Sequence, residues 1–175
     1  MQTKGDSVTY RQCGERDFDS VYFIINEAAA AYRGVVSAVH LTDPYMSRRE
    51  FRSAISAGVE FWGHEENATL RGVMGIQRTQ DVVLIRHAYI RTQYQGQGIG
   101  SGLLKYLTAK TRRPVLVGTW SGMTRTIQFY QRNGFELVPA AAKDALLRKY
   151  WRIPDAQIAG SLVLANVAVE RLVYR

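Results

Sequence analysis

The chain has 175 residues, of which 46% are hydrophobic, and it carries a formal net charge of +8 at pH 7. A chain of this length supports one sizeable hydrophobic core, so we expect a disordered tail at residues 1–6 followed by a single domain over residues 7–175. The basic residues are scattered and form no long run, which argues against a nucleic-acid partner, and no apolar run has the length of a membrane span.

Cysteine usage and the first residues indicate the compartment. Cys13 is the only cysteine, so no disulfide forms within the chain, and the polar start of the sequence lacks the apolar segment of a signal peptide. We therefore expect a cytoplasmic protein in a reducing environment. Neither Cys13 nor the three histidines show the spacing of a metal site, so no metal is expected.

The first elements in chain order are a strand and two helices. Residues 8–12 have the pattern of a short strand, and residues 17–33 place apolar side chains at helical spacing before Gly34, which can end the helix. Ser47 and Glu50 form a capping-box pattern that opens a second helix, and Gly58 can close it.

Three strands follow, and the short turn between the first two predicts an antiparallel arrangement. Apolar, β-branched and aromatic residues are concentrated at residues 59–65, 69–77 and 82–90. Glu66 and Asn67 have the character of a hairpin turn between the first two strands. The third strand leads directly into a glycine-rich segment.

This glycine-rich loop, residues 94–102, joins the strand to an amphipathic helix. Glycines remove the Cβ atoms that keep backbone amides away from a ligand, and the first turn of a helix offers unpaired N–H groups at the positive end of its dipole. Such a junction favours the binding of a phosphate group. Neither the dinucleotide fingerprint Gly-x-Gly-x-x-Gly nor a P-loop fits the spacing of these glycines, which weakens both nucleotide interpretations.

The rest of the chain alternates between strand and helix patterns. Strands are expected at residues 114–120, 136–138 and 158–167, a short helix within residues 124–135, and a further helix at 140–150. The short helix carries Phe129 and Tyr130 and is closed by Gly134 and Phe135, where the glycine can take the left-handed conformation that ends a helix.

Two of these motifs, in this order, resemble the GNAT superfamily of N-acetyltransferases. The first is Gln95-x-x-Gly98-x-Gly100, and the second is Phe129-Tyr130 followed by Gly134-Phe135. The resemblance implies an α/β (α+β) fold with a mixed, mostly antiparallel central sheet flanked by helices, and a cofactor in the gap between the fourth and fifth strands. The order of the expected elements agrees with that fold, with one added helix between the last two strands.

The resemblance also implies a reaction. It indicates transfer of an acetyl group from acetyl-CoA to a primary amine of a small-molecule or peptide acceptor, directly in a ternary complex, and it leaves a homodimer open. A non-catalytic coenzyme A-binding or regulatory domain is the alternative. Met123 and Thr126 stand where family members often carry Asn and Ala, so a cofactor hydrogen bond from that Asn is absent or replaced.

Site residues follow from the same resemblance. Tyr130 is the candidate general acid for the departing thiolate, although a helix tyrosine beside Ile127 is also a common core residue. A backbone N–H near Tyr89 and Ile90 would polarise the carbonyl, and Trp120 would form the opposite wall. The loop residues that would hold the pyrophosphate are Gln95, Gly96, Gln97, Gly98, Ile99, Gly100 and Ser101.

The sequence offers three candidates for the group that deprotonates the amine. His87 lies in the strand before the loop and is the first candidate, although regular alternation places it on the same face as Ile85 and Tyr89, which favours a buried, hydrogen-bonded histidine packed under a helix. Glu60 is the second candidate for the base and Glu27 is the third. His40 and His64 have the character of loop or turn residues without an implied role.

Overall fold

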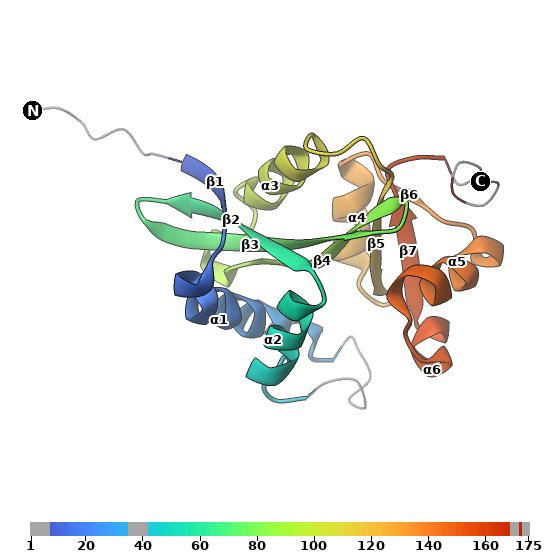
Figure 1. The fold of residues 1–175 in the computed structure, drawn as a ribbon, viewed down its shortest axis with the longest axis horizontal. Coiled ribbons are helices and arrows are strands. Elements are labelled where there is room, and N and C mark those ends of the chain that lie inside the picture. Colours follow the sequence, from blue (N-terminus) through green and yellow to red (C-terminus); the bar gives the residue numbers. More distant parts are fainter. Residues whose placement is uncertain (1–7, 35–41, 169–171, 173–175) are drawn as a thin grey trace, which may run out of the picture.

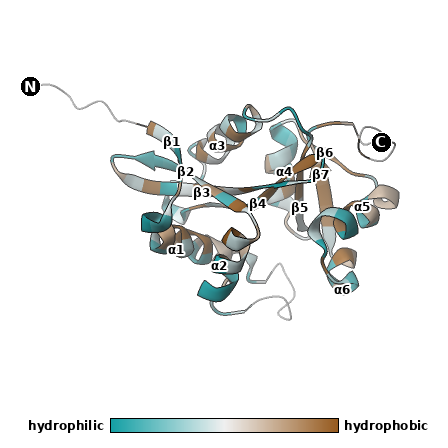
Figure 2. Ribbon diagram, in the orientation of Figure 1, coloured by the Kyte–Doolittle hydropathy of each residue, from teal (hydrophilic) through white to brown (hydrophobic). Residues whose placement is uncertain are grey.

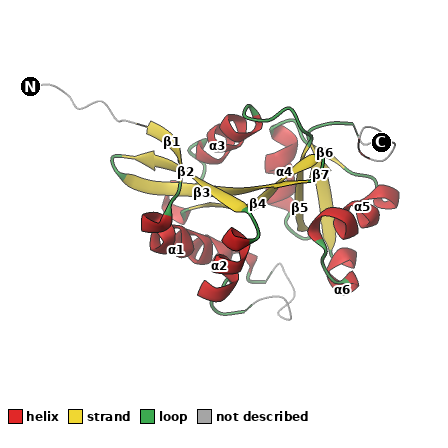
Figure 3. Cartoon of the chain, in the orientation of Figure 1, coloured by secondary structure: helices red, strands yellow, loops and turns green. Residues whose placement is uncertain are grey.

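The computed structural model describes residues 8–34, 42–168 and 172. Within these ranges seven strands form one sheet in the order β1-β2-β3-β4-β5-β7-β6 (Figure 1, Figure 3). Neighbouring strands are antiparallel except β4 and β5, which are parallel. The strands are β1 (Val8–Gln12), β2 (Val59–Glu66), β3 (Thr69–Thr79), β4 (Val82–Ile90), β5 (Val115–Trp120), β6 (Glu136–Leu137) and β7 (Ser161–Ala165). The expected mixed, mostly antiparallel sheet is confirmed, whereas the expected tail at residues 1–6 lies outside the described residues.

Helices cover both faces of the sheet. Those described are α1 (Phe18–Ala28), α2 (Arg48–Ser56), α3 (Ile99–Thr108), α4 (Thr124–Arg132), α5 (Ala140–Leu146) and α6 (Asp155–Ala159). Figure 1 shows α1 and α2 on one face and α3 on the other, and the side chains of α3 and α4 share one buried cluster. A third cluster lies between α5, α6 and the β5–β7 end of the sheet. Figure 2 shows hydrophobic residues along the central strands and hydrophilic residues over much of α2. None of the described helices has both the length and the apolar character needed to span a membrane.

Local sequence signals explain several element ends. The Ser47 side chain accepts a hydrogen bond from the Glu50 N–H, and the Glu50 carboxylate accepts one from the Ser47 N–H, so the predicted capping box opens α2. Asn67 and Ala68, at φ +50° and +59°, form the turn between β2 and β3. The turn therefore lies one residue beyond the expected position, because both central residues need a left-handed backbone.

The end of the chain differs from the sequence-based expectation. The predicted strand at residues 158–167 begins only at Ser161, because the chain after Pro154 forms the short helix α6 and buries Ile158 inside it. The predicted helix at residues 140–150 ends its regular part at Leu146 and continues as a π-helical turn, Leu147–Trp151. The expectation that His64 lies in a turn is wrong: it is buried in β2, with 6% exposed. His40 lies outside the described residues.

The sheet splits between β4 and β5. The two strands pair only at Val83–Val115, Leu84–Leu116 and Ile85–Val117. Beyond these positions β4 continues to Ile90 alongside β3, and β5 continues to Trp120 alongside β7. A gap therefore opens toward the carboxyl ends of two parallel strands, where ligands of mixed sheets bind.

Candidate active site

A cavity of about 180 Å³ occupies this gap. Because the strands have separated, side chains from both faces of the sheet reach it. Tyr89 belongs to the cluster under α1 and α2, whereas Tyr130 belongs to the cluster under α3 and α4, and both line the cavity. The opening thus connects the two faces of the sheet.

The glycine-rich loop leads from the end of β4 into α3. Gly96 and Gly98 have φ angles of +77° and +80°, and an added Cβ at either position would meet no atom within 4 Å beyond the adjoining residues. Gly98 is the N-cap of α3 and has no side chain to satisfy the first N–H groups of the helix. These amides, at Ile99, Gly100 and Ser101, therefore remain free for an anion.

The four loop glycines do not share one role. An added Cβ at Gly100 would lie 3.3 Å from the ring of Phe129, and one at Gly102 would lie 2.2 Å from the hydroxyl oxygen of Tyr10. Gly100 and Gly102 thus allow α3 to pack closely against α4 and β1. Gly96 and Gly98 instead permit the left-handed backbone of the loop.

The end of β4 presents a backbone amide to the gap. The Arg91 N–H donates to the Arg71 carbonyl on β3 at 2.9 Å, so strand alternation turns the N–H and C=O of Ile90 away from β3 and toward the gap. The side chain of Gln95 donates to that Ile90 carbonyl at 3.1 Å and ties the loop to the strand. The Ile90 N–H is left facing the space between β4 and β5.

Tyr130 lies on α4 with only 2% of its surface exposed. Its ring packs against Phe129 and Phe135, with centroids 5.0 Å and 5.5 Å away. Burial raises the pKa of Tyr130 well above that of a free phenol, so its hydroxyl stays protonated at neutral pH. The structure therefore gives this residue the packing of a core tyrosine and a position in the cavity at the same time.

Two tyrosines that the sequence did not single out meet Tyr89 at the cavity. The Tyr32 hydroxyl donates to the Tyr89 hydroxyl at 3.1 Å, and the Tyr45 ring lies 6.4 Å from the Tyr89 ring. Burial raises the pKa of Tyr32 to about 12, so these hydroxyls are neutral. No local pattern marks Tyr32 or Tyr45, because only the packing of α1 and the segment before α2 against β4 brings them here.

His87 occupies a β-bulge in β4. Gly75 pairs with Arg86 and Val73 with Tyr89, so β4 has one more residue than β3 between these two pairs, and His87 has φ +53°. Its ring stacks on Phe61, with centroids 5.9 Å apart, on the face that α1 and α2 cover. The expected alternation with Ile85 is therefore wrong, because Ile85 belongs to the opposite face. Burial and the neighbouring Arg86 lower the pKa of His87 to about 4, so the imidazole is neutral at pH 7.

The two carboxylates considered as bases lie elsewhere. Glu60 alternates with the inward-facing Val59 and Phe61, points to the opposite face from His87, and forms an ion pair with Arg78. Glu27 on α1 accepts hydrogen bonds from the Thr92 N–H at 3.2 Å, which anchors the turn before the glycine loop. The structure thus brings His87 and Tyr130 to the cavity but not Glu60 or Glu27.

The inserted segment between β6 and β7 closes one side of the cavity. Trp120, at the end of β5, lines it, and Trp151 from the π-helical turn lines it as well. Ring atoms of Trp151 lie 3.1–3.3 Å from where a Cβ of Gly118 would be, so the missing side chain lets this indole lie close against β5. Thr126, one of the two departures noted in the sequence, also faces the cavity.

Other chemistries find little support near the cavity. Cys13 is half-buried, and burial raises the pKa of its thiol to about 12, which makes it a poor nucleophile. Among residues 8–34, 42–168 and 172, no three His, Cys, Asp or Glu side chains lie close enough together to hold a metal ion.

Comparison with known proteins gives a family match and a fold match. Residues 57–137 match the family model described as an acetyltransferase (GNAT) domain. No curated protein matches the sequence. PaiA N-acetyltransferase from Thermoplasma acidophilum, in complex with coenzyme A, is similar with a TM-score of 0.67 and 16% identity, over 93% of this chain and 99% of that one.

Two further structures are similar to a comparable degree. The ribosomal-protein-S18-alanine N-acetyltransferase from Escherichia coli gives a TM-score of 0.64 and 17% identity, over 91% of this chain and 92% of that one. YncA from Salmonella typhimurium, with its cofactor acetyl-CoA, gives 0.59 and 20%, over 76% and 82%. At these identities the likeness establishes the fold, and together with the family match it confirms the GNAT resemblance.

Proposed function

Because the chain has the GNAT fold and matches the GNAT acetyltransferase domain over residues 57–137, we propose that it is an N-acyltransferase. It transfers the acetyl group of acetyl-CoA to a primary amine of a small-molecule or peptide acceptor, directly in a ternary complex. The observation that carries this proposal is the gap between β4 and β5, which has free amides at one end and a buried hydroxyl inside.

The proposed binding contacts are largely made by the backbone. The amides at the start of α3 and in the loop from Gln95 to Ser101 hold the pyrophosphate, because Gly96 and Gly98 leave the approach open. The Ile90 N–H, turned toward the gap, donates to the pantetheine arm or to the thioester carbonyl. Trp120 and Trp151 form apolar walls that keep water from the reacting atoms.

Tyr130 is the proposed general acid. Its raised pKa keeps the hydroxyl protonated, and proton transfer to a thiolate, whose thiol has a reference pKa of about 8.5, is uphill and depends on burial raising the pKa of that thiol as well. The amine attacks the thioester carbonyl, the carbon–sulfur bond breaks, and the thiolate takes the phenolic proton. A neutral His87 accepts the proton of the amine, either directly or through water. Glu60 lies on the opposite face of the sheet and would receive this proton only through a chain of water molecules.

Acetyl-CoA turnover with a panel of amines tests the proposal. The panel contains polyamines, aminoglycosides, amino acids and peptides with free N-termini, and the readouts are released thiol and a product heavier by one acetyl group. We expect at least one acceptor to give steady turnover. Acetyl-CoA binding without product from any acceptor would instead indicate the non-catalytic coenzyme A-binding alternative.

A further inference from the structure

Arg86 lies beside the cavity on the same face as His87. It pairs across the sheet with Gly75, and an added Cβ at Gly75 would lie 2.8 Å from Val59 and 3.3 Å from Phe61, both in the cluster under α1 and α2. Cross-strand partners project to the same face, so the Arg86 side chain lies on the face of the sheet that α1 and α2 cover. Arg86 is also one of the residues that line the cavity.

The guanidinium of Arg86 has no charged partner. Its Nη1 donates to the Gln77 side-chain oxygen at 2.9 Å, and Gln77 is fixed in that orientation because its own amide donates to the Ala57 carbonyl at 2.8 Å. No carboxylate in the described part of the chain forms an ion pair with Arg86. Burial alone lowers the pKa of Arg86, as expected for a cation that has lost water without gaining an anion.

Two other half-buried arginines have the anionic partner that Arg86 lacks. Arg11 forms ion pairs with Asp17 and Glu65, and Arg71 forms one with Glu66. A desolvated cation without an anion costs stability, and folded proteins normally supply the partner. At Arg86 the partner found among the described residues is the neutral amide of Gln77, which accepts from one guanidinium nitrogen.

The cavity itself supplies no negative charge. The side chains of its described lining carry hydroxyl, aromatic and aliphatic groups together with Arg86 and His87, and they include no carboxylate. A polyamine would bring only further positive charge to this space.

We propose that the acceptor carries a carboxylate as well as its amine, as an amino acid does, and that Arg86 binds this carboxylate as the specificity-determining residue. A guanidinium offers the paired N–H donors that match a carboxylate, and partial burial would weaken the solvent screening of the pair. The carboxylate of the acceptor would then be the anionic partner that the Arg86 guanidinium lacks in the protein. This inference rests on the proposed acyltransferase function.

Matched acceptors provide the test. Each amino acid is compared with the amine that lacks its carboxylate and with its amide, and kcat/KM is measured for the wild type, Arg86→Gln, Arg86→Lys and Arg113→Gln. Arg113 is an exposed arginine whose contact is the Gln80 carbonyl at 3.2 Å, so it controls for the loss of one surface charge. Thermal unfolding of each variant verifies that it is folded.

The expected result is a selective loss. Wild type should prefer the carboxylated acceptors, and Arg86→Gln should lower their kcat/KM between about tenfold and a thousandfold, with a much smaller change for the partners that lack a carboxylate and no loss of acetyl-CoA affinity. Arg86→Lys should recover part of the loss, and Arg113→Gln should resemble wild type. Equal losses for both members of each acceptor pair, or a wild-type preference for amines without a carboxylate, would overturn the proposal.

Acceptor binding measured by calorimetry separates this inference from the proposed function. If no acceptor is turned over but amino acids bind to the wild type and not to Arg86→Gln, the acyltransfer proposal fails while the carboxylate site stands. If turnover occurs and amino acids bind the two proteins equally, the function stands and the role of Arg86 is refuted.

Discussion

At Tyr130 and His87, burial changes what each side chain can do. It keeps the phenol protonated, which suits a donor, and it keeps the imidazole neutral, which leaves a lone pair to accept a proton. With a pKa of about 4, however, His87 gains little from holding a proton that an amine has lost. Water must therefore share this step, and an acidic limb of kcat/KM near 6.5, the reference value for histidine, is not expected from His87.

Removing the hydroxyl of Tyr130 separates its two roles. Tyr130→Phe keeps the ring contacts with Phe129 and Phe135, so thermal stability should be nearly unchanged while kcat falls by roughly ten- to a thousandfold. Tyr150→Phe is the matched control, because the Tyr150 hydroxyl donates to Asp81 at 2.7 Å outside the cavity. A Tyr130→Phe protein with wild-type kcat would show that this tyrosine is only part of the core.

At the scale of elements, the loop between β4 and α3 depends on a backbone that few residues adopt. Gly98 combines a left-handed backbone with the N-cap position of α3, so its conformation decides where the first amides of the helix point. The element order from β1 to α4 and this loop could be predicted because apolar periodicity and glycine spacing are local signals.

Gly98→Val tests the loop directly. A β-branched residue at φ +80° is strained, so the loop should shift and calorimetry should detect a large loss of acetyl-CoA affinity. Gly58→Val is the control, because Gly58 also has a positive φ, +90°, with open space around it, but it lies at the end of α2. Both variants should lose comparable stability, about 1–3 kcal/mol, and only the first should lose affinity. Unchanged affinity in a folded Gly98→Val protein would contradict the assigned binding loop.

Features that depend on contacts between residues far apart in the sequence could not be predicted from such local signals. The bulge at His87 depends on how β4 pairs with β3, and regular alternation in one strand cannot reveal an extra residue. The tyrosine cluster and Trp151 reach the cavity through tertiary packing. The orientation of Glu60, in contrast, was available from the sequence, because its neighbours Val59 and Phe61 are the apolar positions of β2.

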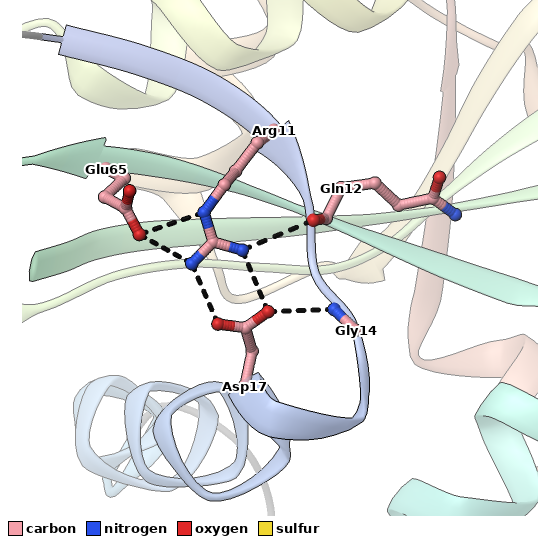
Figure 4. Close-up of polar contacts among 5 residues, drawn as sticks. All are labelled: Arg11, Gln12, Gly14, Asp17 and Glu65. Atoms are coloured by element: carbon pink, nitrogen blue, oxygen red, sulfur yellow. Dashed lines mark hydrogen bonds and ion pairs between the residues drawn. The ribbon is translucent and has the colours of Figure 1, made fainter. Parts of the chain in front are cut away.

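At the scale of the whole molecule, one charged network joins the outer strands to the first helix. Arg11 on β1 donates to both oxygens of Asp17 at 2.8 Å and to Glu65 on β2, and Asp17 also accepts from the Gly14 N–H at 2.8 Å (Figure 4). The Arg11 guanidinium holds the pKa of Asp17 down to about 2. The start of α1 is thereby fixed to the edge of the sheet, and α1 in turn supplies Glu27 and leads to Tyr32.

This network predicts an acid-sensitive stability. Because the pKa of Asp17 is lowered by folding, its contribution is fully present above the unfolded value of about 4 and is lost as the pH falls toward about 2. Asp17→Asn should lower the free energy of unfolding at pH 7 by about 1–2 kcal/mol, allowing for solvent near the network, and should flatten the decline in acid. Urea unfolding across this pH range measures both effects.

Asp19→Asn provides the comparison. Asp19 pairs with Arg48, but their side chains are 78% and 55% exposed, so this change should alter stability by no more than about 0.5 kcal/mol. If the two variants behave alike, the buried network does not contribute beyond an ordinary surface pair.

The bulge in β4 also bears on how related sequences would align with this one. His87 is the surplus residue between two correctly paired positions, so a chain lacking it would keep Gly75 opposite Arg86 and Val73 opposite Tyr89. Such a relative would show a one-residue gap in the alignment without any shift downstream. It would keep the arginine and the tyrosine on one face but lose the imidazole between them, so an aligned gap here would change the lining of the cavity rather than the fold.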